Sequence, residues 1–404
     1  MSKTMKLTVY IGIMLLLAAS ASFSQKIETK DGIRLIHNEK EGKWGKEPKI
    51  ALEYIKNIGD LESDDENVLF YMPSDIAVDE EGNVYVLDSG NHRIQKFDPQ
   101  GNFLASFGRR GQGPGEFQYP QSIDIDENGL MYVSDSGNQK LQILKPDGAL
   151  EKEIKKTDEA PGIIRVRSDQ MIMGQGASVY SFRMGGMQEE QELPKMMKIL
   201  DRDAEVQKEF GDQKDYKDFL VNRIGNRYHF AVDKESHVYV SFDYQNRIEK
   251  YSPDGKLLWR ADRKLNYDVS TPKAKGNVTR SGGNVSIRMP QMNSVSRGIA
   301  VDQKGRVWVV TNKRQIKEEE QVQTSVMVTQ TGGERSRNYS VSGNTDVEET
   351  DMYQLEVYDP EGILLGSIQI DRFADDIHIV KDRIYILDQM RGMQYYVYKI
   401  IETN

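Results

Sequence analysis

The stretch from Pro73 to Phe107 reads PSDIAVDEEGNVYVLDSGNHRIQKFDPQGNFLASF and contains four short segments in which apolar and polar residues alternate. These segments cover residues 76–78, 84–87, 94–97 and 103–107, and runs rich in Asp, Asn and Gly separate them. Alternation with a period of two predicts β-strands, and Asp, Asn and Gly favour tight turns. Four antiparallel strands of this length form one twisted sheet, the blade of a β-propeller.

The same pattern returns along the chain. It begins again at Pro120 as PQSIDIDENGLMYVSDSGNQKLQILKPDGALEKEI, with Asp126 in the place of Asp79. The interval between these two aspartates falls within the period of about 20–50 residues that marks repeat proteins. Weaker copies occupy residues 163–210, 228–260 and 297–368. The sequence therefore predicts a series of four-stranded blades.

The last copy, residues 376–400, has only three strands. The segment 50–58 (IALEYIKNI) alternates like a strand and precedes the first complete blade. Pairing it with the last blade closes the ring and removes the exposed sheet edges. We therefore predict an all-β, six-bladed β-propeller of four-stranded antiparallel blades over residues 49–402, with the last blade closed by the strand at 50–58.

Two stretches resemble the NHL-repeat family of six-bladed propellers, in its exported bacterial type. The first is P-x-x-I-A-V-D-x-x-G-N-V-Y-V-x-D-S-G-N-H-R-I-Q-K-F, residues 73–97, and the second is the linker-like GRRGQGPGEFQYPQSI, residues 108–123. Asn91 and His92 match the name-giving triplet, whereas Arg93 stands where Leu would be. The resemblance implies the same fold, and some relatives of this fold are lyases with a zinc ion held by histidines near the axis.

The first residues predict export from the cell. Residues 1–24 combine Lys3 and Lys6 with an apolar run and then small residues, which is typical of a signal peptide. The apolar run is shorter than the roughly 20 residues of a membrane span, so we expect no membrane insertion. After its removal we expect a soluble periplasmic, cell-surface or extracellular protein, with residues 25–48 as an N-terminal extension before the propeller.

Composition limits the chemistry. The chain has no cysteine, which excludes disulfides and thiolate metal sites. Its net charge of -9 disfavours nucleic acid as a partner. The oligomeric state has no signal in the sequence.

Three long insertions interrupt the repeat, at residues 175–195, 261–296 and 313–352. They fall either between a second and a third strand or between two blades, and these connections open on the same face of a propeller. Loops of this length are usually functional or disordered. We therefore expect a noncatalytic binding propeller that recognises a protein, peptide or glycan on this face. Polar excursions without a partner, or a structural module whose loops touch a partner subunit, remain alternatives.

The candidate ligand-binding residues are cationic or aromatic side chains expected near that face. Arginine suits this role because its guanidinium group binds anionic groups through two parallel hydrogen bonds. The set comprises Arg93, Arg109, Arg110, Lys140, Tyr180, Arg183, Arg247, Arg297 and Arg391. Asp88–Asn91 and Asp135–Asn138 recur beside some of these residues and are interpreted as turns.

The alternative function is a metal-dependent lyase or lactonase-like hydrolase with its site at the central channel. His229, His378, Asp75 and Asp124 are its candidate ligands for zinc or calcium, because they belong to first strands beside the axis. No catalytic residue and no cofactor is predicted, since no H-x-H, H-E-x-x-H or G-x-S-x-G motif occurs. The run from Asp124 to Asp135 begins like a calcium loop, but it lacks the final Glu and fits a hairpin better.

Overall fold

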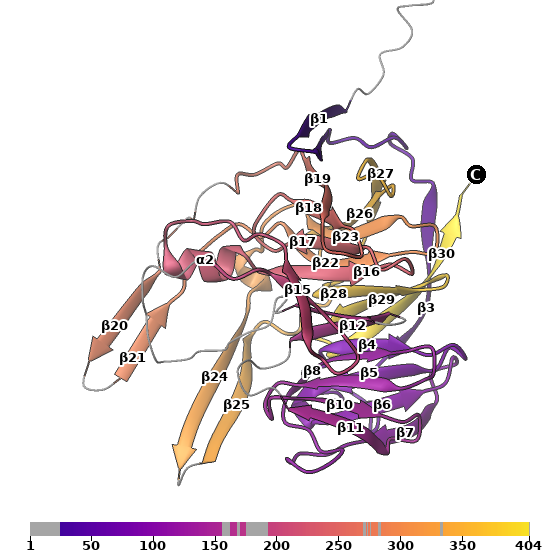
Figure 1. Cartoon of the computed structure of the whole chain (residues 1–404), viewed down its shortest axis with the longest axis vertical. Coiled ribbons are helices and arrows are strands. Elements are labelled where there is room, and N and C mark those ends of the chain that lie inside the picture. The colour runs from indigo at the N-terminus through magenta and orange to yellow at the C-terminus, as the bar shows by residue number, and fades with distance from the viewer. Residues whose placement is uncertain are drawn as a thin grey trace, which may run out of the picture.

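The computed structural model describes residues 25–155, 162–167, 170–174, 193–269, 272, 274, 276–281, 284–331 and 334–403. Within them six antiparallel sheets follow one another as the blades of a propeller (Figure 1). The first blade consists of β4 (Asp75–Val78), β5 (Val84–Asp88), β6 (Arg93–Phe97) and β7 (Phe103–Phe107). The second consists of β8 (Pro120–Ile125), β9 (Met131–Asp135), β10 (Lys140–Leu144) and β11 (Leu150–Lys155). The third consists of β12 (Ile163–Arg167), β13 (Gln170–Gly174), β14 (Met197–Leu200) and β15 (Val206–Phe210).

The remaining blades complete the ring. The fourth blade consists of β16 (Tyr228–Val232), β17 (Val238–Phe242), β18 (Ile248–Tyr251) and β19 (Leu257–Arg263). The fifth consists of β22 (Ser296–Val301), β23 (Val307–Asn312), β26 (Tyr353–Tyr358) and β27 (Leu364–Gln369). The sixth consists of β28 (Asp376–Val380), β29 (Arg383–Asp388), β30 (Gln394–Glu402) and β3 (Ile50–Ile58). β3 pairs antiparallel with β30, so the predicted closure of the last blade by residues 50–58 is confirmed.

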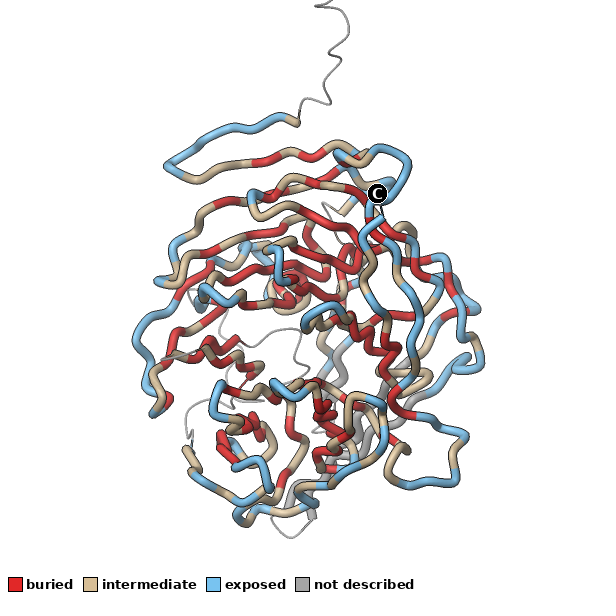
Figure 2. Tube along the Cα trace, turned by 90° about the vertical axis from the view of Figure 1, so that its right-hand side faces the viewer, coloured by how far each residue is buried: buried red, intermediate tan, exposed pale blue. Residues whose placement is uncertain are grey.

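The second strand of each blade is buried on both faces because a neighbouring blade packs against each side. Every residue of β5, β9, β17 and β23 is buried, whereas exposed and intermediate residues alternate along the outer strand β7. Figure 2 shows the buried segments inside the molecule and the exposed segments at its periphery. Continuous apolar runs such as the one in β23, VWVVTN, are the sequence signature of such strands.

The hydrophobic core of the described residues is divided into six clusters, each shared by two adjacent blades. The cluster that seals the ring joins Tyr385 and Val397 of the sixth blade to Ile76 and Val86 of the first. Burying the apolar side chains between blades provides the main stabilisation of the fold.

A repeated aspartate shapes the turn between the first and second strands. The Asp79 carboxylate accepts the Asn83 amide at 2.8 Å and the Tyr85 hydroxyl at 3.2 Å, while Gly82 adopts a φ of 88°. Asp126 caps its turn in the same way, so the stretch that begins like a calcium loop is a hairpin. The same contacts recur at Asp233 and Asp302, where Tyr239 and Trp308 are the aromatic donors.

The N-terminal extension is a strap across three blades. β1 (Lys26–Lys30) pairs with β2 (Ile33–Asn38), and β2 adds in parallel to β19 at the outer edge of the fourth blade. The amide of Trp44 then donates to the Leu365 carbonyl of β27 at 2.7 Å, and the chain continues into β3 of the sixth blade. A side chain at Gly42 would lie 2.4 Å from that carbonyl, so only glycine allows this close approach.

Two of the three long insertions form hairpins. β20 (Asn277–Ser281) pairs with β21 (Asn284–Arg288), and β24 (Val322–Thr331) pairs with β25 (Glu334–Gly343). Both hairpins project together away from the blades in Figure 1. Most of the remaining insertion, residues 175–192 of 175–195, lies outside the described residues. A common face for all three insertions therefore stays a prediction.

Three short helical segments also occur among the described residues: η1 (Ser89–Asn91), α2 (Phe219–Gly225) and η2 (Glu318–Glu320). α2 precedes the fourth blade, and the Asp218 carboxylate caps it by accepting the Val221 amide at 3.0 Å. No helix in the described part of the chain combines the length and the apolar character needed to cross a membrane.

Candidate functional site

The six first strands surround the axis and bring polar residues together in two rings. The register of each first strand with its second strand shows that six residues occupy equivalent positions, which we call one level of the axis: Asp75, Ser122, Ile163, His229, Gly298 and Asp376. Two positions further along, Ala77, Asp124, Arg165, Ala231, Ala300 and His378 form the next level. Alternation within a strand places both levels on the same side of each blade.

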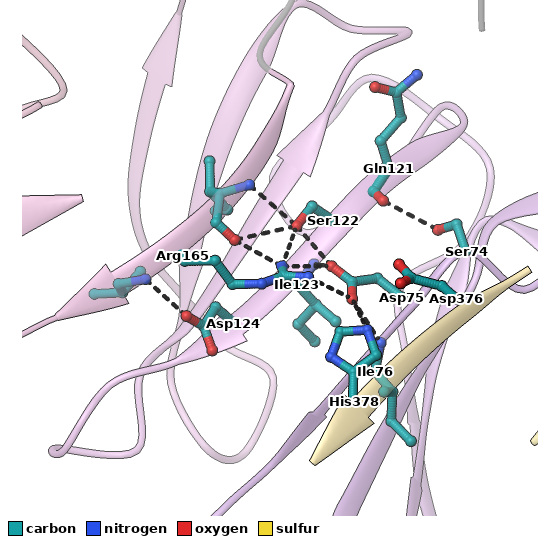
Figure 3. A network of polar contacts seen from close by, with 12 residues as sticks. Ser74, Asp75, Ile76, Gln121, Ser122, Ile123, Asp124, Arg165, Asp376 and His378 are labelled. Atoms are coloured by element: carbon teal, nitrogen blue, oxygen red, sulfur yellow. Dashed lines mark hydrogen bonds and ion pairs between the residues drawn. The ribbon is translucent and has the colours of Figure 1, made fainter. Parts of the chain in front are cut away.

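Asp75 is the centre of a network that joins four blades (Figure 3). Its carboxylate accepts hydrogen bonds from Arg165 Nη1 at 2.9 Å and Ser122 Oγ at 2.6 Å, and lies 3.2 Å from His378 Nε2. Burial alone would raise the pKa of Asp75, but the charge of Arg165 and the contact with His378 hold that pKa well below its usual range. Asp75 is therefore a paired, ionised carboxylate.

A second network lies between the fourth and sixth blades. His229 Nδ1 is 3.6 Å from Asp376 Oδ1, and His229 Nε2 is 3.2 Å from Asp243 Oδ1. The intervening position in the fifth blade is Gly298, where a Cβ atom would lie 2.6 Å from the Asp376 carboxylate. Glycine at this level therefore allows histidine and aspartate from non-adjacent blades to meet.

The carboxylate of Asp243 is fully buried and also contacts Arg227, whose Nε lies 3.3 Å away. Burial would raise the pKa of Asp243, but the charges of Arg227 and His229 lower it to about 2. Burial would likewise lower the pKa of His229, but Asp376 and Asp243 raise it to about 9. The second network therefore holds His229 as a cation between two carboxylates.

The raised pKa of His229 predicts a loss of stability in alkali. Its pKa is about 9 in the fold and about 6.5 in an unfolded chain, so the stabilisation is complete below pH 6.5 and disappears as the pH rises through 9. The free energy of unfolding, measured by urea titration across this range, should fall by on the order of 3 kcal/mol. His229→Gln should remove most of this dependence, whereas the control His237→Gln should keep it. An equal slope in wild type and His229→Gln would contradict the assignment.

The four candidate metal ligands do not come together as one set. Asp75 and His378 touch each other, but the Arg165 guanidinium binds both oxygens of Asp75, at 2.9 and 3.3 Å. Asp124 accepts the Val166 amide at 2.7 Å and lies 3.3 Å from Arg167 Nη1, and His229 belongs to the second network. No group of three or more His, Cys, Asp or Glu suited to a metal ion occurs among the described residues. The arrangement resembles a chain of ion pairs, in which arginine already neutralises the carboxylates.

Four of the predicted ligand-binding cations are held by contacts within the fold. Arg93 Nε donates to Asp88 at 2.8 Å, and Lys140 Nζ binds Glu153 at 2.9 Å and two backbone carbonyls. Arg247 stacks on Phe242, with its guanidinium carbon 3.9 Å from the ring centre. Arg391 stacks on Phe373 at 3.4 Å. These contacts position the loops, and ligand contact by these residues stays a prediction.

The other predicted ligand-binding residues have different surroundings. The Arg109 side chain is 81% exposed and pairs with Glu116, and Arg110 forms a backbone bridge with Phe117. Arg297 precedes Gly298 and interacts electrostatically with Asp243. Tyr180 and Arg183 lie outside the described residues.

The sequence did not reveal a buried polar cluster at the base of both hairpins. Arg263, at the end of β19, is 2.7 Å from Glu356 and donates to Ser296 and Thr311, each at 3.0 Å. The hydroxyl of Tyr358 donates to the same Glu356 carboxylate at 2.7 Å. Arg263, Ser296 and Thr311 lie at or next to the ends of β19, β22 and β23, where the two insertions leave the fourth and fifth blades. Glu356 lies within β26, and Tyr358 lies at the opposite end of that strand. Because the arginine and the glutamate are both almost fully buried and paired, this base is rigid.

Several solved structures are similar to this chain at low sequence identity. A DUF4221 family member from Bacteroides vulgatus aligns with a TM-score of 0.54 and 11% identity over 88% of this chain and 99% of its own. A Bacteroides fragilis protein provisionally described as exported gives 0.49 and 9% over 92% and 100%, and a gluconolactonase from Xanthomonas campestris gives 0.47 and 13% over 87% and 95%. The likeness to the Bacteroides vulgatus protein, at 11% identity, extends to the fold alone.

A family model supports the same fold from the sequence side. No curated protein matches the chain. The model that does match is DUF5128, described as a six-bladed β-propeller, and it covers residues 24–273, which is more than half of the chain. The narrower resemblance to NHL repeats stays a prediction. The chain belongs to the DUF5128 family of six-bladed β-propellers.

Proposed function

We propose that this propeller is an exported binding protein that recognises a protein, peptide or glycan on the face from which the hairpins β20–β21 and β24–β25 project. The observation that carries the proposal is the pair of hairpins on adjacent blades (Figure 1). Ser296, Asn312 and Tyr353, where the insertions join the fifth blade, lie at the same end of its strands. Both hairpins therefore start from the same side of the ring.

The backbone of the hairpins also favours a binding role. Each hairpin is a separate two-stranded sheet in the described part of the chain, so each strand has one edge without a neighbouring strand. Isolated two-stranded hairpins are only marginally stable, and open edges readily accept an added strand from a partner. Export is supported by the signal-like residues 1–24, which lie outside the described residues.

Removing one hairpin tests the proposal. The variant replaces Val322–Gly343 with two glycines, because the Asn344 amide already donates to the Gln321 carbonyl and the ends are close. Immobilised wild type and variant are incubated with the cell-envelope fraction, and retained proteins and glycans are quantified by mass spectrometry. We expect a defined subset of ligands to bind the variant about tenfold less, equivalent to losing about 1.4 kcal/mol of binding free energy.

A matched control keeps this experiment interpretable. Deleting residues 25–32 removes the exposed strand β1 and should leave the retained set unchanged. Both variants must show the thermal unfolding midpoint of the wild type within a few degrees. If the hairpin deletion retains the same ligands in the same amounts as the wild type, the proposed face is wrong.

A further inference from the structure

A cavity of about 430 Å³ lies between the fourth and fifth blades, above the Arg263–Glu356 pair. Its walls come from four parts of the chain: the N-terminal strap, the beginning of the 261–296 insertion, both ends of the 313–352 insertion, and the strands β23, β26 and β27 of the fifth blade. This volume falls within the range of about 300–1,000 Å³ typical of small-molecule sites. The two insertions thus form a pocket as well as the hairpins.

The pocket carries a local surplus of positive charge. Lys264 pairs with Glu39, Arg263 with Glu356, and Arg314 with Asp351 and Glu320. The two further lysines of the lining, Lys40 and Lys313, have no carboxylate partner among the described residues, and Lys313 donates instead to the neutral amide of Gln369. Two uncompensated ammonium groups at one cavity are notable in a chain whose net charge is -9. They favour a ligand with an anionic group.

The rest of the lining suits hydroxyl groups better than apolar surface. Neutral polar side chains outnumber the two leucines, Leu265 and Leu364; they are Asn266, Thr311, Asn312, Gln354 and Ser367. The side-chain carbonyl oxygen of Asn312 is buried and has no hydrogen-bond partner in the described part of the chain. A buried acceptor without a donor is costly, and a ligand hydroxyl would satisfy it.

We infer that this cavity binds an acidic saccharide, a sugar that carries a carboxylate. Lys40 and Lys313 bind the carboxylate, while the neutral amides and hydroxyls bind the sugar hydroxyls. The paired Arg263 and Glu356 form a fixed floor that need not rearrange when the ligand enters. The inference deepens the proposed function, since it assigns a ligand class to the same face.

Direct titration of the purified protein, without residues 1–24, tests the inference. The probes are D-glucuronate and D-galacturonate, with D-glucose and D-galactose as neutral counterparts and inorganic phosphate as a bare anion, each measured by calorimetry and ligand-observed NMR. We expect a uronate to bind at least about tenfold more tightly than its neutral counterpart and than phosphate. Binding should weaken as salt is added, because exposed ammonium groups are screened.

Two double variants with the same change of charge locate the site. Lys40→Gln with Lys313→Gln removes both uncompensated ammonium groups and should lower uronate affinity by about tenfold or more. Lys234→Gln with Lys256→Gln removes two exposed lysines from the turns at the opposite face of the fourth blade and should leave the affinity unchanged.

Three results would overturn the inference: no uronate binding by the wild type, equal binding by the Lys40/Lys313 variant, or phosphate binding as tight as uronate. The hairpin deletion separates this inference from the proposed function, because Lys40, Lys313 and Arg263 remain in that variant. If the hairpin deletion retains every envelope ligand and the uronate as well, the proposed binding face is refuted and the proposed pocket is supported. If the hairpin deletion loses envelope ligands while the wild type binds no uronate, the proposed pocket is refuted and the proposed binding face is supported.

Discussion

Replacing Arg165 with methionine is expected to lower the free energy of unfolding by about 3–5 kcal/mol, because it leaves a buried carboxylate without its main counter-charge. The Asp75 side chain is only 4% exposed and receives two hydrogen bonds from this guanidinium group. Methionine keeps the length and apolar stem of arginine, so the change isolates the lost charge. Urea unfolding at pH 7, followed by tryptophan fluorescence, measures the difference.

The matched control is Arg109→Met. Arg109 is also paired with a carboxylate, that of Glu116, but its side chain is 81% exposed. Exposed pairs contribute about 0–1 kcal/mol, so this variant should unfold almost like the wild type. Similar effects of the two substitutions would show that the Asp75 network is not the buried, charge-coupled cluster described above.

Removing residues 25–58 is expected to abolish cooperative unfolding of the propeller. This truncation deletes β2 and β3 and exposes the edges of β19 and β30, which then invite aggregation. It also removes Ile36, Ile50 and Ile58, which are 1–3% exposed. At about 1.5–3 kcal/mol each, these three side chains alone represent much of the 5–15 kcal/mol by which a typical domain is stable.

The shorter truncation, residues 25–32, provides the comparison. β1 is exposed along its whole length, and among the described strands it pairs with β2 alone, so its loss should change the free energy of unfolding by about 0.5 kcal/mol or less. Calorimetry and size-exclusion chromatography of both proteins measure stability and aggregation. A monomeric, cooperatively folded protein that begins at residue 59 would refute the closing role of the N-terminal segment.

Some of the site could be located from sequence because it depends on position within a blade. His229, His378, Asp75 and Asp124 all lie on first strands, as the repeat predicts. Their partners could not be found in this way. Arg165 lies in a blade whose repeat is weak, and the role of Gly298 becomes visible only when His229 and Asp376 face each other across it.

A repeated residue can also change its role between blades. Asp88 and Asp135 each accept a backbone amide of the preceding linker, from Tyr71 at 2.8 Å and from Gln118 at 2.9 Å. In the fourth blade Phe242 occupies this place, and Asp243 follows one residue later with its carboxylate in contact with Arg227 and His229. The spacing in the fourth blade therefore differs by one residue, and the carboxylate there meets different partners.

Local sequence patterns predicted neither the pairing of the N-terminal strap nor the pocket. Residues 34–38 pair with residues 259–263, and no local pattern marks a parallel pairing between segments so distant in the chain. The short helix α2 was also not predicted, because seven residues are too few for a helical period to emerge.

The sequence by itself determined the six blades, their turns and the strand that closes the ring, since strand alternation and turn chemistry depend on residues close together in the chain. Only the tertiary structure decided which charges pair along the axis, how residues 33–44 bind the outer strands, and that Lys40 and Lys313 share one cavity. The physical reason is that these contacts join blades far apart in sequence, and the packing of six sheets around an axis sets the distances between them.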